Sequence, residues 1–244
     1  MNMANPYFQF QRFTVYHDKC AMKVGTDGVL VGAWANIDNA NRILDIGTGT
    51  GLIALMAAQR TEATIDAIDV DDDACLQATE NVQRSPFANR IYILHTGLED
   101  FLPGQQGGYD RIVTNPPYFV DSLKCPNDKR NLARHTDTLS LDSLLTHGKR
   151  LLNPEGQLAL ILPFDQLNRL KALSQEKDLY LHRLTEVVPV EGGNPKRLLA
   201  ELSPMPTLHP VYDRLVIENK DHHYTEPFVN LIREFYIRWP LVSR

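Results

Sequence analysis

The stretch "RILDIGTGTGLIALMAAQR" (42–60) decides the fold, because it passes from a strand pattern through a glycine loop into a helix pattern. It begins with a short, mostly apolar run and ends in strong helix formers. Gly47, Gly49 and Gly51 lie two residues apart between these patterns. Glycine permits positive φ and close approach of the backbone to a ligand. The loop therefore predicts a nucleotide-type cofactor above the carboxyl ends of parallel strands.

Strand and helix patterns continue to alternate after this loop. The predicted strands are 42–46, 64–68, 90–94, 110–114 and 156–162, and the predicted helices are 51–60, 72–85, 140–152 and 164–177. Such alternation is typical of a parallel sheet that is covered by helices on both faces.

The last third of the chain changes this rhythm, because two strand patterns, 179–190 and 196–204, follow each other without a helix. They predict a hairpin and an antiparallel edge of the sheet. A further edge strand over 212–218 is left open. A C-terminal helix is predicted over 225–238, with Thr225 as its cap and a proline in its first turn.

The totals describe a single domain of generous size with a full core. The chain has 244 residues, of which 43% are apolar. Three widely spaced cysteines indicate reduced cytosolic thiols and show no metal-ligand spacing. We find no signal peptide, and the densest apolar run, "LALILP", is too short to cross a bilayer. We therefore expect a cytoplasmic protein without a bound metal or a membrane partner.

The net charge of −5 argues mildly against nucleic-acid binding when it is taken alone. Its distribution matters more, since 62–80 carries carboxylates without any Lys or Arg, whereas 122–150 is locally basic. An acidic face and a basic segment can coexist on one surface.

The glycine loop favours S-adenosylmethionine over other nucleotide-type cofactors. Its spacing differs from the dinucleotide fingerprint, and it lacks the Lys of a phosphate-binding loop. Asp45 precedes the glycines, where a carboxylate would repel a pyrophosphate but suit an amino group. Asp69 ends the next strand, where an acid can bond both ribose hydroxyls. Glu99 and Asp100 follow the third strand, and either could reach the adenine amine. A tight turn that binds no ligand is the simpler alternative for the glycines.

The stretch "DRIVTNPPYF" (110–119) predicts the catalytic group, because an apolar strand ends there in Asn115. An exocyclic amine of a base or an amide is a poor nucleophile, since its lone pair is delocalised. Two acceptors aimed at its N–H bonds, Asn115 Oδ1 and the carbonyl of Pro116, would localise that lone pair. Pro116 and Pro117 hold the backbone extended, and Tyr118 offers a face on which a flipped base can stack. Such catalysis depends on positioning and electrostatics. A strand-ending turn with an incidental Asn is the alternative.

With these two motifs in order, the sequence resembles the class I S-adenosylmethionine-dependent methyltransferases that act on amino groups. More narrowly, it is similar to the bacterial tRNA1(Val) (adenine-37-N6)-methyltransferases. The narrower resemblance depends on "FTVYHDKCAMKVGTDGVLVGAWA" (13–35), on "RNLARHTDTLSLDSLL" (130–145), and on "GGNPKRLLAEL" with "YTEPFVNLIREFY" near the end. It implies a Rossmann-like α/β fold with a mostly parallel seven-stranded sheet, an antiparallel edge hairpin and helices on both faces. Residues 1–40 would be an N-terminal extension over the cofactor, and 41–244 the methyltransferase domain of one compact unit.

The resemblance also implies roles for individual residues. The cofactor would be bound by Asp45, Gly47, Thr48, Gly49, Gly51, Asp69 and Glu99, with Lys23, Thr26 and Asp27 as further candidates. The target adenine would be bound by Asn115, Pro116, Pro117 and Tyr118. The candidates for contact with tRNA are Lys124, Lys129, Arg130, Arg134, His135, Lys196 and Arg197. An ordinary solvated face is the alternative for these charges.

The implied function is transfer of a methyl group to the N6 amine of an adenine in tRNA, by a monomer or weak dimer. Enzymes that methylate a guanine N2 of rRNA or a glutamine amide of a protein would use the same core. A cofactor-binding scaffold without activity is an alternative of another class, against which the intact Asn-Pro-Pro-Tyr stretch argues.

Overall fold

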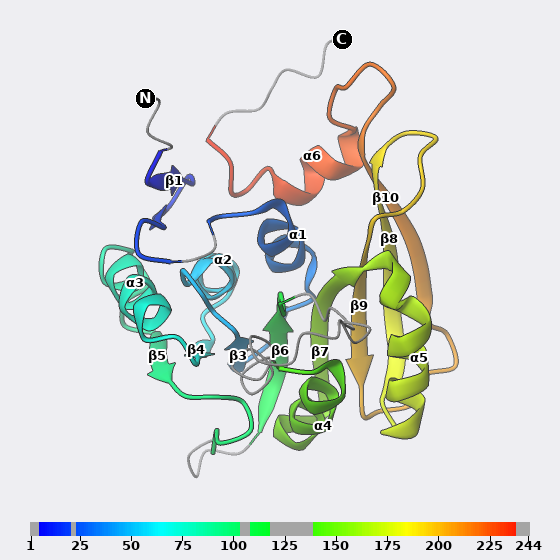
Figure 1. The fold of residues 1–244 in the computed structure, drawn as a ribbon, viewed down its shortest axis with the longest axis horizontal. Coiled ribbons are helices and arrows are strands. Elements are labelled where there is room, and N and C mark those ends of the chain that lie inside the picture. Colours follow the sequence, from blue (N-terminus) through cyan, green and yellow to red (C-terminus); the bar gives the residue numbers. More distant parts are fainter. Residues whose placement is uncertain (1–4, 21–22, 103–107, 118–138, 238–244) are drawn as a thin grey trace, which may run out of the picture.

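The computed structural model describes residues 5–20, 23–102, 108–117 and 139–237. Most of these residues form an eight-stranded sheet with helices on both faces (Figure 1). The order across the sheet is β10-β8-β9-β7-β6-β3-β4-β5. The strands are β3 (Arg42–Ile46), β4 (Thr64–Asp69), β5 (Ile91–His95), β6 (Tyr109–Thr114), β7 (Leu152–Pro163), β8 (Tyr180–Val190), β9 (Arg197–Ser203) and β10 (Val211–Glu218).

Within this eight-stranded sheet, neighbouring strands are parallel except where β9 is involved, which runs antiparallel to both β7 and β8. The predicted mostly parallel sheet and the hairpin of β8 and β9 are confirmed. The sheet has one strand more than the seven predicted. The additional strand is β10, which pairs in parallel with β8 at the edge and covers the segment that the sequence left open.

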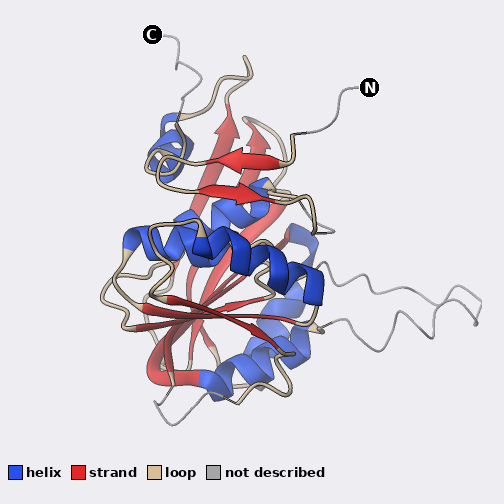
Figure 2. Ribbon diagram, turned by 90° about the vertical axis from the view of Figure 1, so that its left-hand side faces the viewer, coloured by secondary structure: helices blue, strands red, loops and turns tan. Residues whose placement is uncertain are grey.

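The helices form two layers, one on each face of the sheet (Figure 2). The core of one face includes residues of α1 (Thr26–Trp34), α2 (Leu52–Arg60), α3 (Asp72–Gln83) and α6 (Glu226–Ile232). The core of the other face includes residues of α4 (Leu141–Leu151) and α5 (Leu167–Glu176). The glycine loop follows β3, so it lies at the edge of the sheet where the carboxyl ends of β3, β4 and β6 meet.

Strand β7 is a continuous apolar run because both of its faces are buried. Leu158, Leu160 and Leu162 belong to the core on one face, whereas Ala159 and Ile161 belong to the core on the other. Successive side chains of a strand point to opposite faces, and both faces of this sheet are covered. Burying a leucine contributes about 1.5–3 kcal/mol to stability, so such strands strongly favour the central positions.

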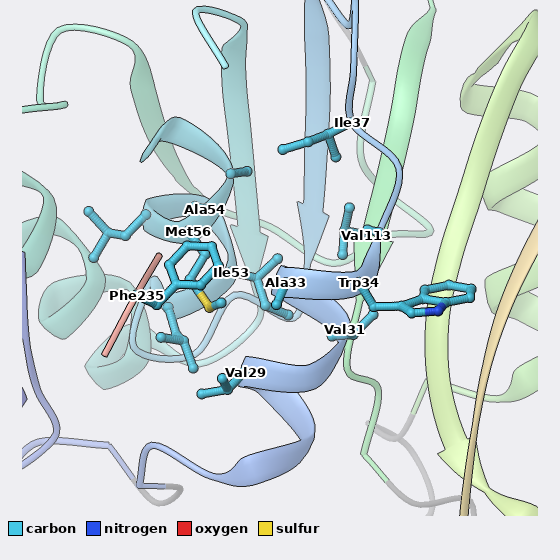
Figure 3. Close-up of a cluster of buried hydrophobic side chains, with 14 of the residues drawn as sticks. Val29, Val31, Ala33, Trp34, Ile37, Ile53, Ala54, Met56, Val113 and Phe235 are labelled. Carbon is cyan, nitrogen blue, oxygen red and sulfur yellow. The ribbon is translucent and has the colours of Figure 1, made fainter. Parts of the chain in front are cut away.

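Helix α1 was not predicted, because seven of its nine residues are buried and its sequence has no polar face. It packs directly on α2. A Cβ at Gly32 would lie only 2.9 Å from Met56 Sδ, so a larger residue there would force the buried Met56 side chain to shift. Figure 3 shows Val29 and Val31 of α1 in one apolar cluster with Met56. The predicted extension 1–40 therefore contributes a helix to the central core.

The C-terminal helix is shorter than predicted. It begins after the Thr225 cap as expected, but it ends at Ile232 instead of 238. Beyond it, Phe235 is buried and its carbonyl accepts a hydrogen bond from Gln11 N at 2.7 Å. Tyr236 forms a bridge with Phe10, next to the small hairpin of β1 (Tyr7–Gln9) and β2 (Thr14–Tyr16). Tertiary pairing with the N-terminal segment therefore overrides the helical pattern of 233–237.

Candidate cofactor and catalytic site

A cavity of about 690 Å³ lies at the carboxyl ends of β3, β4, β5 and β6. It is lined by Cys20, Ile46, Gly47, Gly49, Ile68, Asp69, Val70, Asp71, Ala74, Thr96, Gly97, Leu98, Glu99, Asp100, Asn115, Pro117 and Leu139. The two sequence motifs, which are separated by some sixty residues, thus meet in one space because parallel neighbouring strands end at the same edge.

The first two glycines of the loop have a left-handed backbone conformation, and no other atoms crowd them. Gly47 has φ of 69° and Gly49 has φ of 55°, in the left-handed region that favours glycine. A Cβ built on either of them would meet no atom within 4 Å. Both glycines line the cavity. The constraint on these positions is therefore backbone conformation together with access for a ligand.

Asp45 and Thr48 support the loop from below. Asp45 is fully buried, and its Oδ2 accepts hydrogen bonds from Thr48 Oγ1 at 2.7 Å and from Ala54 N at 3.1 Å. Burial raises the pKa of Asp45 to about 7, and these two hydrogen bonds oppose the rise. Its Oδ1 has no hydrogen-bond partner among the described residues. Neither side chain is part of the cavity lining, and the hydrogen bonds of Asp45 connect the loop to the first turn of α2 beneath it.

Asp69 stands at the end of β4 and lines the cavity. Its Oδ2 accepts a hydrogen bond from Gly49 N at 2.8 Å, and its Oδ1 accepts one from Asp71 N at 3.1 Å. A carboxylate oxygen can accept more than one hydrogen bond, so both oxygens keep capacity for a ligand. Asp71 caps α3, because its side chain accepts hydrogen bonds from Asp73 N and Ala74 N.

Glu99 and Asp100 both line the cavity and both are exposed. Glu99 Oε1 accepts a hydrogen bond from Ser143 Oγ at 2.7 Å, which joins this loop to the first turn of α4. The contact of Glu99 or Asp100 with the adenine amine stays a prediction.

Asn115 follows directly on β6, and its half-buried side chain faces the cavity. Thr114 Oγ1 donates a hydrogen bond to Ile46 O at 2.8 Å, which fixes the end of β6 beside the glycine loop. In the part of the chain that the structure describes, the Asn115 amide makes no hydrogen bond. Pro117 is exposed and lines the cavity, whereas Pro116 is buried. Tyr118 lies outside the described residues.

The other sequence candidates divide into three groups. Lys23 is exposed and does not line the cavity. Thr26 begins α1 and lines a second cavity together with Lys196 and Arg197, so the structure separates it from the other cofactor candidates. The remaining RNA candidates, which are Lys124, Lys129, Arg130, Arg134 and His135, lie outside the described residues.

Sequence reasoning missed Cys20 as part of the site. The segment before it lies along α3, where Lys19 N donates a hydrogen bond to Gln77 Oε1 at 3.0 Å, and this places Cys20 at the cavity. Burial, with the nearby aspartates, raises the pKa of Cys20 to about 11, so it is a neutral thiol. No pattern in the sequence distinguishes Cys20 from the other cysteines.

Among the described residues, no group of three or more His, Cys, Asp or Glu side chains could hold a metal ion. None of the helices in the described ranges is long and apolar enough to cross a membrane.

Comparison with known proteins assigns the chain to a family. The model of the methyltransferase small domain matches residues 25–176. A tRNA1(Val) (adenine(37)-N6)-methyltransferase of Parabacteroides distasonis is 57% identical over 97% of this chain and all of its own length. One of Bacteroides thetaiotaomicron is 48% identical over 96% of this chain and 99% of its own.

Solved structures share the fold at low sequence identity. A predicted O-methyltransferase of Agrobacterium tumefaciens superimposes with a TM-score of 0.67, over 89% of this chain and all of its own, at 18% identity. A ribosomal protein L11 methylase of Lactobacillus delbrueckii superimposes with a TM-score of 0.50, over 72% of this chain and 76% of its own, at 18% identity.

The sheet order, the left-handed glycine loop and the Asn-Pro-Pro segment at the end of β6 define a Rossmann-like class I methyltransferase. Within that class, the chain belongs to the family of the tRNA1(Val) (adenine(37)-N6)-methyltransferases, which confirms the resemblance found in the sequence.

Proposed function

We propose that the protein transfers a methyl group from S-adenosylmethionine to the exocyclic N6 amine of adenine 37 in tRNA1(Val). The observation that carries this proposal is the position of Asn115, whose amide has no hydrogen-bond partner among the described residues and faces the cavity beside the glycine loop. The substrate is the one for which the close relatives are named.

The cavity fits a cofactor that is cationic and carries no phosphate. Its lining contains four carboxylates, those of Asp69, Asp71, Glu99 and Asp100, and the described lining contains no Lys or Arg. Such a lining repels a pyrophosphate and attracts an ammonium or sulfonium group. The buried Asp45 Oδ1, which has no described partner, adds a further site for positive charge below the loop.

Separate residues would hold the parts of the cofactor. Asp69 would accept hydrogen bonds from the ribose hydroxyls, and Gly47 and Gly49 would lie against the methionine part. Glu99 or Asp100 would accept a hydrogen bond from the adenine amine. When bound, S-adenosylmethionine supplies an electrophilic methyl group on its sulfonium.

The chain's own contribution to the reaction is to hold the amine. Asn115 Oδ1 and the carbonyl of Pro116 would each accept one N–H of the target amine, which aims its lone pair at the methyl group. The two prolines restrict the backbone of this segment, so that the acceptors are positioned before the substrate arrives. Tyr118 would stack on the flipped adenine. The proton of the methylated amine can leave to solvent.

The RNA would reach this site through a local positive patch, because the whole chain has a net charge of −5. We include Lys124, Lys129, Arg130, Arg134 and His135 in that patch, since they follow the catalytic segment closely in the sequence. An anticodon loop suits such a site, because its single-stranded bases can be splayed out. A cytoplasmic location and a monomer or weak dimer are part of the same proposal.

The decisive experiment follows tritiated methyl groups from S-adenosylmethionine into tRNA1(Val) transcribed in vitro. We expect N6-methyladenosine in the nuclease digest, and loss of labelling when adenine 37 is replaced by guanine. Unmodified rRNA and a whole-protein extract are offered in parallel. Label in rRNA guanine or in protein alone would replace the proposed substrate with one of these two alternatives.

A further inference from the structure

A second cavity, of about 340 Å³, lies beside the start of α1. We call it the α1–β9 cavity, and its lining residues are Thr26, Asp27, Leu30, Val187, Pro189, Lys196, Arg197 and Ile217. It shares no lining residue with the cofactor cavity. Its residues come from the first turns of α1, the end of β8, the start of β9 and the end of β10, so it lies at the carboxyl edge of the sheet.

The α1–β9 cavity is close to the catalytic amide. A Cβ at Gly28 would lie 3.9 Å from Asn115 Nδ2, and Gly28 is the residue next to Asp27 along α1. The start of α1 thus lies near Asn115 and also forms one wall of this cavity. A group bound here would be a near neighbour of whatever Asn115 holds.

One side of the α1–β9 cavity is apolar and the other offers hydrogen bonds. Leu30, Val187 and Ile217 provide aliphatic surface. Opposite charges meet on the polar side, where Arg197 Nε donates to Asp27 Oδ2 at 2.9 Å. A flat heterocycle matches this lining, because its faces are apolar and its edge carries both donors and acceptors.

Lys196 gives the α1–β9 cavity an exposed positive charge. It has no carboxylate partner in the part of the chain that the structure describes, in contrast to Arg197. The Asp27 carboxylate makes the interior a poor place for a phosphate, whereas the exposed ammonium of Lys196 is well suited to one. The volume is at the low end for ligand pockets and has room for one base or nucleoside.

We propose that the α1–β9 cavity binds the base of a nucleotide adjacent to the methylated adenine, and that Lys196 contacts the phosphate of that nucleotide. This inference rests on the proposed function and names a second contact of the same substrate. Flipping the target base requires it to lose its stacking on a neighbour. A site for the neighbour would hold the loop in the splayed form that methylation needs.

The test combines a cavity-filling variant with base-deleted RNA. Ile217→Phe narrows the cavity without changing charge, and synthetic anticodon stem-loops carry an abasic nucleotide on the 5′ or the 3′ side of the target. We expect Ile217→Phe to weaken binding of the intact stem-loop about tenfold, as does loss of one stacked base. One of the two stem-loops lacks the base that the cavity would bind. With that stem-loop, wild type and Ile217→Phe should bind alike.

Three readouts distinguish this cavity from its alternatives. Lys196→Ala should reduce the slope of log K against log salt concentration by about one, as expected for one lost phosphate contact. Affinity for S-adenosylhomocysteine should be unchanged in both variants. The matched control is Arg214→Ala, which breaks the exposed Arg214–Glu186 pair of the same strands, β10 and β8, outside the cavity. It should bind RNA like wild type.

The proposal is overturned if the loss from Ile217→Phe adds fully to the loss from the 5′ abasic nucleotide and also to the loss from the 3′ abasic nucleotide, or if Ile217→Phe binds RNA normally. An unchanged salt slope in Lys196→Ala would overturn the phosphate contact, even if Ile217→Phe failed to fold. Weakened cofactor affinity would assign the cavity to the cofactor instead. If the wild-type protein methylates no RNA, the proposed function fails, and that outcome is separate from all of these.

Discussion

Asn81 joins the N-terminal segment to the glycine loop, because its Nδ2 donates hydrogen bonds to Tyr16 O and to Thr50 O, each at 2.8 Å. Its Oδ1 accepts a third hydrogen bond from Tyr16 N at 2.9 Å, and the side chain is fully buried. A single amide of α3 therefore fixes the segment that leads to Cys20 and also the backbone between Gly49 and Gly51. This relationship couples the position of the N-terminal segment to the shape of the cofactor site.

Asn81→Ala should destabilise the protein and also weaken cofactor binding. Leaving buried backbone groups without partners costs about 1–3 kcal/mol of the free energy of unfolding. The freed Thr50 carbonyl should loosen the loop, so the dissociation constant of S-adenosylhomocysteine should rise. Thermal unfolding and isothermal titration calorimetry measure the two effects.

A matched control separates the two effects of Asn81→Ala. Asn153 Nδ2 donates to Asp110 Oδ1 at 2.7 Å, and neither residue lines the cofactor cavity. Asn153→Ala should lower the melting temperature yet leave cofactor affinity unchanged. Equal weakening of cofactor binding in both variants would show that Asn81 acts only through global stability.

Asn115→Ala should reduce the rate of methyl transfer and spare cofactor binding. Removing one preorganised hydrogen-bonding group at a reacting centre costs about 10²–10³ in kcat. Asn115 and Pro117 both line the cofactor cavity. Asn115 would hold the target amine, whereas the carboxylates of the lining would hold the cofactor. Single-turnover kinetics with saturating cofactor measure the rate, and calorimetry measures the affinity.

The control for Asn115 is Asn168→Ala, a change at an exposed residue of α5, outside the cofactor cavity. It should have the kcat of the wild type. A variant Asn115→Ala that loses cofactor binding but keeps its single-turnover rate would contradict the assigned role.

The alternating part of the fold could be predicted because its signals are local. Strand β3, the glycine loop and α2 follow from one continuous stretch, and parallel pairing then brings Asn115 beside Gly47. The helix predicted from residue 140 is confirmed as well, since Ser140 caps α4 and its Oγ accepts a hydrogen bond from Ser143 N at 3.0 Å.

The parts that could not be predicted depend on contacts between distant segments. Helix α1 has no polar face, because it is buried between α2, α6 and the sheet, so its periodicity is absent. The end of the helix at Ile232 depends on pairing with the N-terminal segment. Cys20 reaches the cofactor cavity only because amides of α3 hold the preceding backbone. No pattern within a short window of sequence reports such contacts.

Asp69→Ala should weaken the cofactor before it affects the rate. The variant loses an acceptor for Gly49 N and removes a carboxylate from the cavity wall. Hydrogen bonds to a charged group contribute about 1.5–3 kcal/mol, so affinity for S-adenosylmethionine should fall about 10- to 100-fold. The kcat at saturating cofactor should stay within a few-fold of the wild type.

The control for Asp69 lies three residues earlier on the same strand. Asp66 is hydrogen-bonded to Arg42 and Tyr109 and does not line the cofactor cavity. Asp66→Ala should cost stability without changing cofactor affinity. An Asp69→Ala variant that binds S-adenosylmethionine as tightly as the wild type would remove Asp69 from the cofactor site.

The buried carboxyl of Asp45 should make both stability and cofactor binding depend on pH. Burial, helped by the nearby Asp69, raises its pKa to about 7, whereas an unfolded chain has an aspartate pKa of about 4. Between these values the folded state holds a proton that the unfolded chain has released. The contribution of Asp45 to stability is therefore full below about pH 4 and is lost as the pH rises towards 7. A bound cation reverses this preference, because it favours the ionised carboxylate.

Affinity for S-adenosylmethionine should consequently increase as the pH rises through about 7, with release of a proton on binding. Calorimetry in two buffers with different ionisation enthalpies measures that proton. Asp45→Asn keeps an oxygen acceptor for Thr48 and Ala54 but cannot ionise, so its affinity should be lower and independent of pH over this range. If the wild type and Asp45→Asn share the same pH profile, another group is responsible, and the carboxyl of Asp45 has only a structural part in the loop.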